Sequence, residues 1–128
     1  MDERDRFAKG LEIRRAVLGD AHVDASLAKK NPFSEPFQDL ITRYAWGEIW
    51  SRPGLPRSTR SLLTLAMLVA LNRGEEFRMH VRAALRNGVT RDEIQETLLQ
   101  CAIYCGVPAA NSAFQAAAEV FSDVDSGR

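Results

Sequence analysis

The side chain best suited to proton transfer in this sequence is His80, because an imidazole titrates near neutral pH. It lies in residues 75–88, a stretch that is predicted to form one helix. The apolar face of that helix is made of Phe77, Val81, Ala84 and Leu85. His80 falls at the edge of this face, one turn after Glu76. The pattern fits a proton-transfer group, and it fits equally a polar residue satisfied at the edge of the core.

Glu48 is the second candidate, because it interrupts an apolar pattern. The predicted helix from about Glu35 to Trp50 carries a sharp apolar stripe of Phe37, Leu40, Ile41, Tyr44 and Ala45. Glu48 projects into the middle of this stripe. Burial of a lone charge is costly, so the carboxylate should be paired, protonated or directed into a polar pocket. A structural ion pair and a catalytic or substrate-facing acid both remain open.

Two tryptophans lie on the other side of the same predicted helix. Trp46 and Trp50 point away from the apolar stripe, which implies that a second surface of this helix is also covered. Aromatic side chains are enriched at protein interfaces, so a contact between subunits is expected to supply that cover. Trp46 is also a candidate for contact with a substrate.

Arginines provide the candidate anion-binding groups. Arg78, Arg82 and Arg86 follow one flank of the helix at residues 75–88 with a spacing of four. Arg60 stands in the first turns of another predicted helix, residues 57–72. A cation there opposes the helix dipole, so it is better explained if it serves an anion or a carboxylate. A solvated surface position is the equally open alternative for Arg60.

The two cysteines, Cys101 and Cys105, are four residues apart on one face of a predicted helix. They align with apolar neighbours and lack the C-x-x-C spacing of redox motifs. We therefore expect core thiols and no disulfide framework.

Composition excludes several classes of partner. The 128 residues and 45% hydrophobic content suit one domain, residues 1–128, with a substantial core. Seventeen basic and seventeen acidic residues balance, which gives no indication of a nucleic-acid surface. The charged N-terminus, residues 1–6, lacks the apolar stretch of a secretory signal, and no apolar run approaches the roughly 20 residues that span a membrane. A cytoplasmic protein is expected.

The elements that must position these side chains are all predicted to be helical, because no strand pattern occurs anywhere. About six to seven helices are expected, at residues 3–18, 23–30, 35–50, 57–72, 75–88, 90–104 and from 108 onward. The helix at 57–72 is apolar on every side from Leu62 and should be the central element. No dinucleotide or phosphate-loop motif is present, and Glu76 with His80 alone makes a weak metal site. An all-α protein without a cofactor or metal is expected.

Several ordered blocks resemble the carboxymuconolactone decarboxylase family. They comprise residues 14–23, 44–50, 52–55, 59–66, 80–90, 93–94 and 104–110, which together extend over nearly the whole chain. The resemblance implies a fold of the alkyl hydroperoxidase D type and a homo-oligomer, commonly a trimer or hexamer. It also implies a role in the protocatechuate branch of the β-ketoadipate pathway.

Redox members of that superfamily carry C-x-x-C followed three residues later by histidine. The corresponding segment here, residues 73–80, keeps His80 but contains no cysteine. Thiol redox chemistry is therefore disfavoured. The alternatives are a related helical oligomer acting on another small lactone, a peroxide or thiol oxidoreductase, and a helical interaction protein without activity.

The resemblance implies decarboxylation of 4-carboxymuconolactone, a small lactone dicarboxylate, to the enol-lactone of β-ketoadipate. This substrate supplies its own electron sink, so no cofactor is required. By this resemblance His80 is the general acid or polarises the lactone carbonyl, while Glu48 holds and tunes His80 or an arginine. Arg60 and Arg82 orient the carboxylates, and Glu76 and Trp46 line the site.

Overall fold

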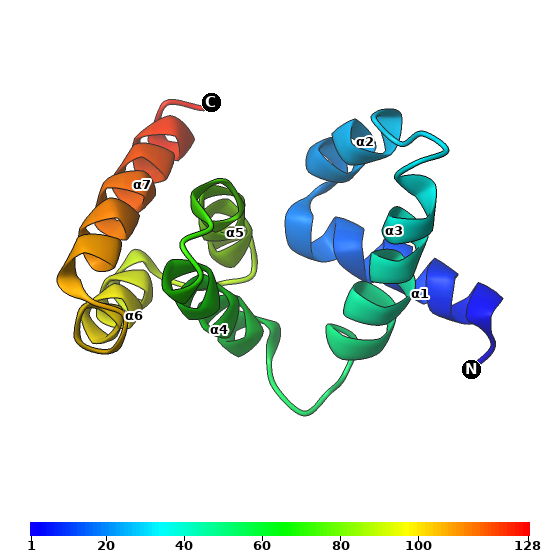
Figure 1. Ribbon diagram of the computed structural model, residues 1–128, viewed down its shortest axis with the longest axis horizontal. Helices are drawn as coiled ribbons and strands as arrows, with labels where there is room; N and C mark the ends of the chain where they lie inside the picture. Colours follow the sequence, from blue (N-terminus) through cyan, green and yellow to red (C-terminus); the bar gives the residue numbers. More distant parts are fainter. The chain divides into compact units, whose positions relative to one another are not determined.

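The chain is helical throughout and divides into two compact units. The computed structural model describes residues 1–128 and contains seven α-helices, one π-helix and no strand, which confirms the expected all-α class (Figure 1). The first unit comprises residues 1–56 and the second residues 57–128. The boundary falls at the end of residues 51–56, which contain two prolines and separate the helices expected at 35–50 and 57–72. The single domain expected from chain length stays a prediction.

Unit 1 contains α1 (Glu3–Leu18), α2 (Asp20–Ala28), α3 (Glu35–Leu40) and the π-helix η1 (Ile41–Ile49). Asp2 caps α1, because its carboxylate accepts a hydrogen bond of 2.8 Å from the Asp5 N–H. Gly19, with a φ of 91°, separates α1 from α2. Because η1 follows α3 without a break, the expected helix 35–50 exists, but its second half is π-helical.

Two glycines let α1 approach η1 closely. A Cβ atom on Gly10 would lie 1.8 Å from the Thr42 carbonyl oxygen, and one on Gly47 would lie 2.5 Å from the Arg6 carbonyl oxygen. Only a residue without a side chain fits at either position. The crossing of these two helices therefore depends on the pair Gly10 and Gly47.

The prediction that the apolar stripe of the helix at 35–50 packs in the core is wrong. Phe37 is 59% exposed, Leu40 51% and Tyr44 41%, whereas Thr42, Trp46 and Gly47 are buried. Tyr44 lies in η1, where hydrogen bonds run from i to i+5, so a wheel drawn for an α-helix misplaces its faces. Phe37 and Leu40 lie in α3, which buries none of its residues. The close crossing with α1 then decides which face of η1 is covered.

Unit 2 contains α4 (Arg57–Ala70), α5 (Gly74–Arg86), α6 (Arg91–Tyr104) and α7 (Val107–Asp125). Their inward faces form one hydrophobic core, whose largest fully enclosed side chains are Leu65, Val81, Ile94 and Leu98. The alanine stripe of α7 joins this core through Ala113, Ala116 and Ala117, since small side chains permit close helix packing.

A local sequence signal marks the start of α6. Thr90 and Glu93 form a reciprocal capping box at the start of α6, with hydrogen bonds of 2.9 and 3.0 Å. The expectation that α4 is covered on every side is wrong, because Leu63 is 43% exposed and Met67 58%. Only one face of α4 packs on the core.

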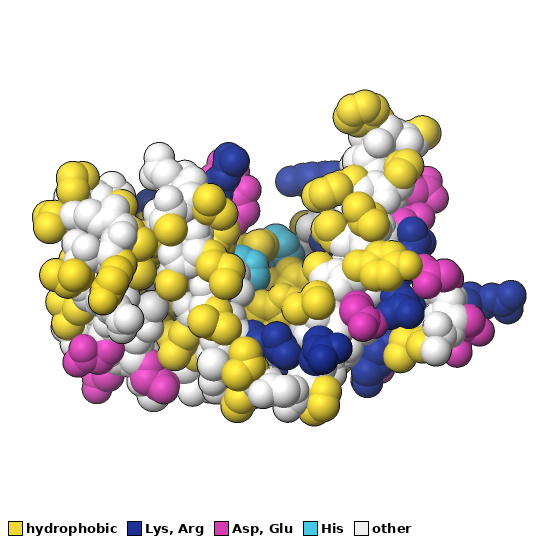
Figure 2. Space-filling model, turned by 60° about the horizontal axis from the view of Figure 1, so that its bottom comes forward, with side chains coloured by type: hydrophobic (Ala, Val, Ile, Leu, Met, Phe, Trp, Pro, Cys, Tyr) yellow, Lys and Arg dark blue, Asp and Glu magenta, His cyan; other side chains and the backbone are white.

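Hydrophobic side chains remain visible on the surface of both units (Figure 2). The most exposed ones on α6 and at the start of α7 are Ile103, Tyr104 and Val107, at 79%, 82% and 68%. None of the helices has both the length and the apolar character needed to cross a bilayer.

Candidate functional site

His80 lies on the buried face of α5, at its edge, as the sequence indicated. The helix turns Phe77, Val81 and Ala84 into the core, and His80 is itself only 9% exposed. An imidazole that is 9% exposed has restricted access to water. Such a group can transfer a proton to a bound molecule with little competition from solvent.

The register of α4 against α5 is fixed by a buried polar contact. The Asn87 amide, at the end of α5, donates a hydrogen bond of 3.1 Å to the hydroxyl of Ser61, which is fully buried. Arg60 precedes Ser61 in the first turns of α4 and is half-buried. Its guanidinium is therefore neither a freely solvated group nor part of the core.

Glu76 and Arg82 lie on the exposed part of α5. Arg78, on the same helix, pairs with Glu119 of α7 at 2.7 Å, in an ion pair that is open to solvent on both sides. The structure thus places His80 and Arg60 in partly enclosed surroundings and Glu76 and Arg82 at the surface of unit 2. The roles expected for these four residues stay predictions.

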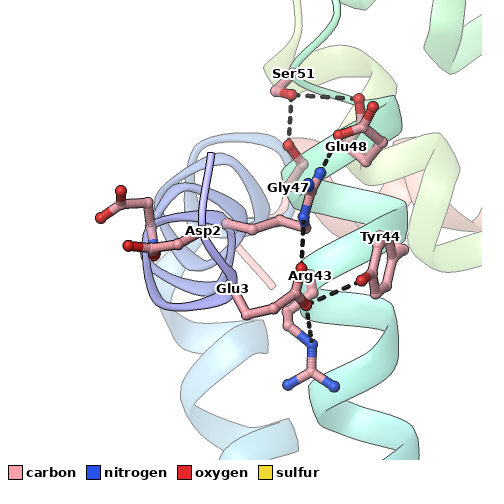
Figure 3. A network of polar contacts seen from close by, with 9 residues as sticks. Asp2, Glu3, Arg43, Tyr44, Gly47, Glu48 and Ser51 are labelled. Atoms are coloured by element: carbon pink, nitrogen blue, oxygen red, sulfur yellow. Dashed lines mark hydrogen bonds and ion pairs between the residues drawn. The ribbon is translucent and has the colours of Figure 1, made fainter.

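Glu48 lies in unit 1, where it forms an ion pair with Arg6 of α1 (Figure 3). The Glu48 side chain is 44% exposed and that of Arg6 is 18% exposed, so the carboxylate does not enter an apolar core as the helical wheel suggested. The structural ion pair that the sequence left open is thus present. The expected pairing of Glu48 with His80 joins residues of different units and stays a prediction.

Glu3 extends this network along α1 (Figure 3). Its carboxylate pairs with Arg6 at 3.2 Å and with Arg43 at 3.3 Å, and it accepts a hydrogen bond of 2.9 Å from the Tyr44 hydroxyl. The hydrogen bond from Tyr44, supported by the arginines, lowers the pKa of Glu3 below its ordinary value. Arg6 therefore serves two carboxylates, and its place beside Glu48 is fixed from the N-terminal end of α1.

Trp46 is 6% exposed and stacks on Trp50, with ring centroids 5.2 Å apart. The expectation that a second subunit is needed to cover this side of the helix is therefore wrong for Trp46. The covered face of η1 packs on α1, where the glycine crossing brings the two backbones together.

Both cysteines are free thiols, as expected. Cys101 is buried, and burial together with the neighbouring Cys105 raises its pKa to about 11. They line a surface cavity of about 300 Å³ between α4 and α6, with Leu62, Leu63 and Tyr104 among the other lining residues. None of the expected site residues lines this cavity. A thiol with so high a pKa is a poor nucleophile at neutral pH.

His22 and two arginines of α1 were not read correctly from the sequence. His22 precedes the helix expected at residues 23–30, but it lies inside α2 and is half-buried. Arg6 and Arg14 were not singled out at all. Their spacing of four on either side of Gly10 was the available signal, because positions 6, 10 and 14 share one face of a helix.

The described residues define an all-helical protein with an enclosed histidine and several half-buried arginines. Nowhere do three or more histidine, cysteine or acidic side chains gather as a metal cluster would require. The sequence model of the carboxymuconolactone decarboxylase family matches residues 35–119, which extend across both units. The chain belongs to the carboxymuconolactone decarboxylase family, as its sequence blocks indicated.

Two named relatives are similar over nearly the full length of the chain. The chain is 54% identical to 4-carboxymuconolactone decarboxylase of Acinetobacter baylyi over 124 residues, which cover 97% of this chain and 92% of that protein. It is 42% identical to nitrosuccinic acid decarboxylase of Metarhizium robertsii over 125 residues, covering 97% and 87%. A 48-residue 4-carboxymuconolactone decarboxylase sequence of Pseudomonas putida is 56% identical over its whole length, or 38% of this chain.

Proposed function

We propose that the protein decarboxylates 4-carboxymuconolactone to the enol-lactone of β-ketoadipate, in the catabolism of protocatechuate. The observation that carries this proposal is the 54% identity, over 97% of the chain, to a protein of that name. The enclosed position of His80 supports it, because the reaction needs one positioned proton donor.

The reaction requires few functional groups from the protein. The bond between the ring carbon and the departing carboxylate breaks, CO2 leaves, and the electron pair spreads over the conjugated alkene and the lactone carbonyl. The resulting dienolate is then protonated on carbon. The protein must bind two carboxylates, stabilise the enolate oxygen and deliver the proton.

His80 is the residue that we assign to the proton. Imidazole is a general acid and a hydrogen-bond donor, so His80 suits either protonation of carbon or polarisation of the lactone carbonyl. The helix α5 holds it at the edge of the core between buried turns at Phe77 and Ala84. This restricts the direction in which the ring can present its N–H.

Arg60 is the first candidate for a substrate carboxylate. It is half-buried, so a charge-assisted hydrogen bond from its guanidinium is less screened than one at an open surface. Arg82 and Glu76 are exposed on α5 and are assigned weaker parts in orienting the substrate. Removing Arg60 is expected to raise KM more than removing Arg82.

Glu48 and Trp46 are assigned to the site from η1. π-helical segments are frequently found at functional sites, and both residues lie in one. The ion pair with Arg6 presents Glu48 as a charged acceptor that can orient a donor group. Trp46, fixed by its stack on Trp50, offers a rigid apolar surface.

A second candidate substrate class is a 2-nitro dicarboxylate. It is favoured by the 42% identity to a protein named nitrosuccinic acid decarboxylase. Loss of CO2 from the carbon that bears a nitro group leaves its electron pair on the nitro oxygens as a nitronate. That group then accepts a proton on carbon, so the same set of protein groups would suffice: an acid and cationic carboxylate binders.

The protein is further proposed to assemble as a homo-oligomer, a trimer or a hexamer, in the cytoplasm. The apolar side chains left exposed on α6 and α7, among them Ile103, Tyr104 and Val107, support association because such patches are uncommon on monomers. Light scattering coupled to size-exclusion chromatography measures the mass directly. A monomer at micromolar concentration would contradict this assembly.

The function is tested by absorbance with purified protein and enzymatically generated 4-carboxymuconolactone. Loss of the substrate and formation of the enol-lactone, without added cofactor, are the expected result. Nitrosuccinate in a parallel reaction is expected to turn over far more slowly. If nitrosuccinate were consumed and the lactone were not, the second candidate would replace the first, and inertness toward both would overturn the assignment.

A further inference from the structure

Arg14 is a buried cation without a counter-ion in the protein. It lies on the inner face of α1 and is only 4% exposed. Its Nη1 donates to the Gln38 side-chain oxygen at 3.1 Å and to the Thr42 hydroxyl at 3.5 Å, and both acceptors are neutral. Burial lowers the pKa of Arg14, but a guanidinium stays charged at any physiological pH. Such a charge is costly to enclose unless an anion meets it.

The acids of the following helix are engaged elsewhere, and Glu12, two residues before Arg14, is exposed. The two acids of α2, Asp20 and Asp24, both pair with Arg15, at 3.2 and 2.9 Å. The other arginines of α1 and η1 that form ion pairs, Arg6 and Arg43, do so with Glu3 and Glu48. Arg14 is therefore left with neutral partners while its neighbour Arg15 takes two carboxylates.

The surroundings of Arg14 are electropositive. His22 of α2 is half-buried, and its pKa is lowered by that burial and by the positive charges of Arg14 and Lys29. The lowered pKa leaves the His22 imidazole neutral near pH 7, so Arg14 and Lys29 are the two cations that act on this region of unit 1. Their combined field favours an anion there.

The geometry of the guanidinium selects the kind of anion. Nη1 is occupied by Gln38 and Thr42, whereas the buried Nε–H has no acceptor within the protein. The edge formed by Nε and Nη2 is one of the two edges at which a guanidinium presents parallel N–H groups. These match the two oxygens of a carboxylate in a bidentate pair.

We propose that Arg14 anchors a binding site in unit 1 for the carboxylate of a small molecule. The guanidinium receives both carboxylate oxygens on its Nε and Nη2 edge, and Lys29 adds favourable charge. Gln38 and Thr42 hold the opposite side of the guanidinium and so fix its orientation. This site is separate from the assignment of His80, and the proposal does not depend on which reaction the protein catalyses.

The test is a binding measurement on the full chain, with succinate as the probe. The thermal unfolding midpoint is followed as sodium succinate is titrated against sodium chloride of equal ionic strength. We expect a saturable rise specific to succinate in the wild type and in the control Arg15→Met, whose guanidinium is already paired. Arg14→Met should abolish this rise. A midpoint equal in the two salts, or a rise that survives in Arg14→Met, would overturn the proposal.

A second variant covers failure of Arg14→Met to fold. Arg14→Lys keeps the positive charge but replaces the planar pair of donors by a single ammonium. Succinate binding to Arg14→Lys should be weakened about tenfold or more, as measured by isothermal titration. Unchanged affinity would contradict bidentate recognition. Equal binding of sulfate and succinate by the wild type would overturn the assignment to carboxylates.

Discussion

Arg6 and Glu48 join the first helix of unit 1 to its π-helix by an ion pair. Glu3 binds the Nε of the same guanidinium, whereas Glu48 binds its Nη1, so Arg6 links two carboxylates. The pair is partly open to water, since the Glu48 side chain is 44% exposed. Exposed ion pairs contribute only about 0.2–1 kcal/mol to stability. Glu48 can therefore be replaced without unfolding the protein, which makes its part in the reaction measurable.

Glu48→Gln is expected to leave the free energy of unfolding within about 1 kcal/mol of the wild type. Its kcat with 4-carboxymuconolactone should fall at least about tenfold, because the charged acceptor in η1 is lost. Urea unfolding and steady-state kinetics measure the two effects separately.

Glu3→Gln is the matched control, because it removes the other carboxylate of Arg6 and leaves Glu48 in place. Its kcat should remain close to that of the wild type. A Glu48→Gln enzyme that is folded and fully active would remove Glu48 from the site. A variant that fails to fold would assign Glu48 a purely structural role.

The crossing of α1 and η1 gives a stability prediction. In Gly10→Ala the new Cβ would meet the Thr42 carbonyl oxygen at 1.8 Å, so the two helices must move apart. Overpacking of this kind costs about 3 kcal/mol or more when backbone atoms are involved. The urea concentration at which half of the helical circular dichroism is lost should therefore be lower than in the wild type.

Gly74→Ala provides the comparison, since a Cβ atom at this first residue of α5 meets no neighbouring atom. It should be neutral or stabilising by up to about 1 kcal/mol, because alanine restricts the unfolded chain more than glycine does. Equal stability of Gly10→Ala and the wild type would mean that the close crossing is not maintained in solution.

Much of the fold follows from the sequence where local signals are strong. The capping box of Thr90 and Glu93 marks the start of α6, and the buried face of α5 follows the 3.6-residue period through Phe77, Val81 and Ala84. These signals depend on residues close together along the chain. They place His80 correctly at the edge of a buried face.

The errors arise where contacts between distant segments decide the structure. The predicted stripe was wrong at Tyr44, which lies in the π-helix η1, and at Phe37 and Leu40, which lie in α3, where no residue is buried. No local residue pattern marks a π-helix. The ion pair of Glu48 depends on Arg6, 42 residues earlier in the chain. A glycine is required at position 10 only because η1 lies against it in the folded protein.

The raised pKa of the Cys101 thiol predicts how the stability of the protein changes at alkaline pH. Its pKa is raised to about 11 by burial and by Cys105, from a value of 9.0 for a thiol in the unfolded chain. The folded state thus favours the protonated thiol. The stability that this preference contributes is complete below pH 9. That contribution should be lost as the pH rises from 9 toward 11.

The measurement is the free energy of unfolding in urea at pH values from 8 to 11, compared between the wild type and Cys101→Ala. The difference in the free energy of unfolding between the two proteins should be constant up to pH 9. Above pH 9 the wild type should lose stability relative to Cys101→Ala. A difference that does not change with pH would contradict an elevated thiol pKa. The thiol should also resist iodoacetamide at neutral pH in the folded protein.

The central claim is that His80 delivers the proton that completes decarboxylation, and turnover of 4-carboxymuconolactone by His80→Gln tests it most directly. Glutamine keeps a polar side chain at the edge of α5 but cannot act as an acid. We expect kcat to fall by about 100-fold or more while the thermal unfolding midpoint and the helical circular dichroism are retained. A folded His80→Gln enzyme with near wild-type kcat would contradict the claim.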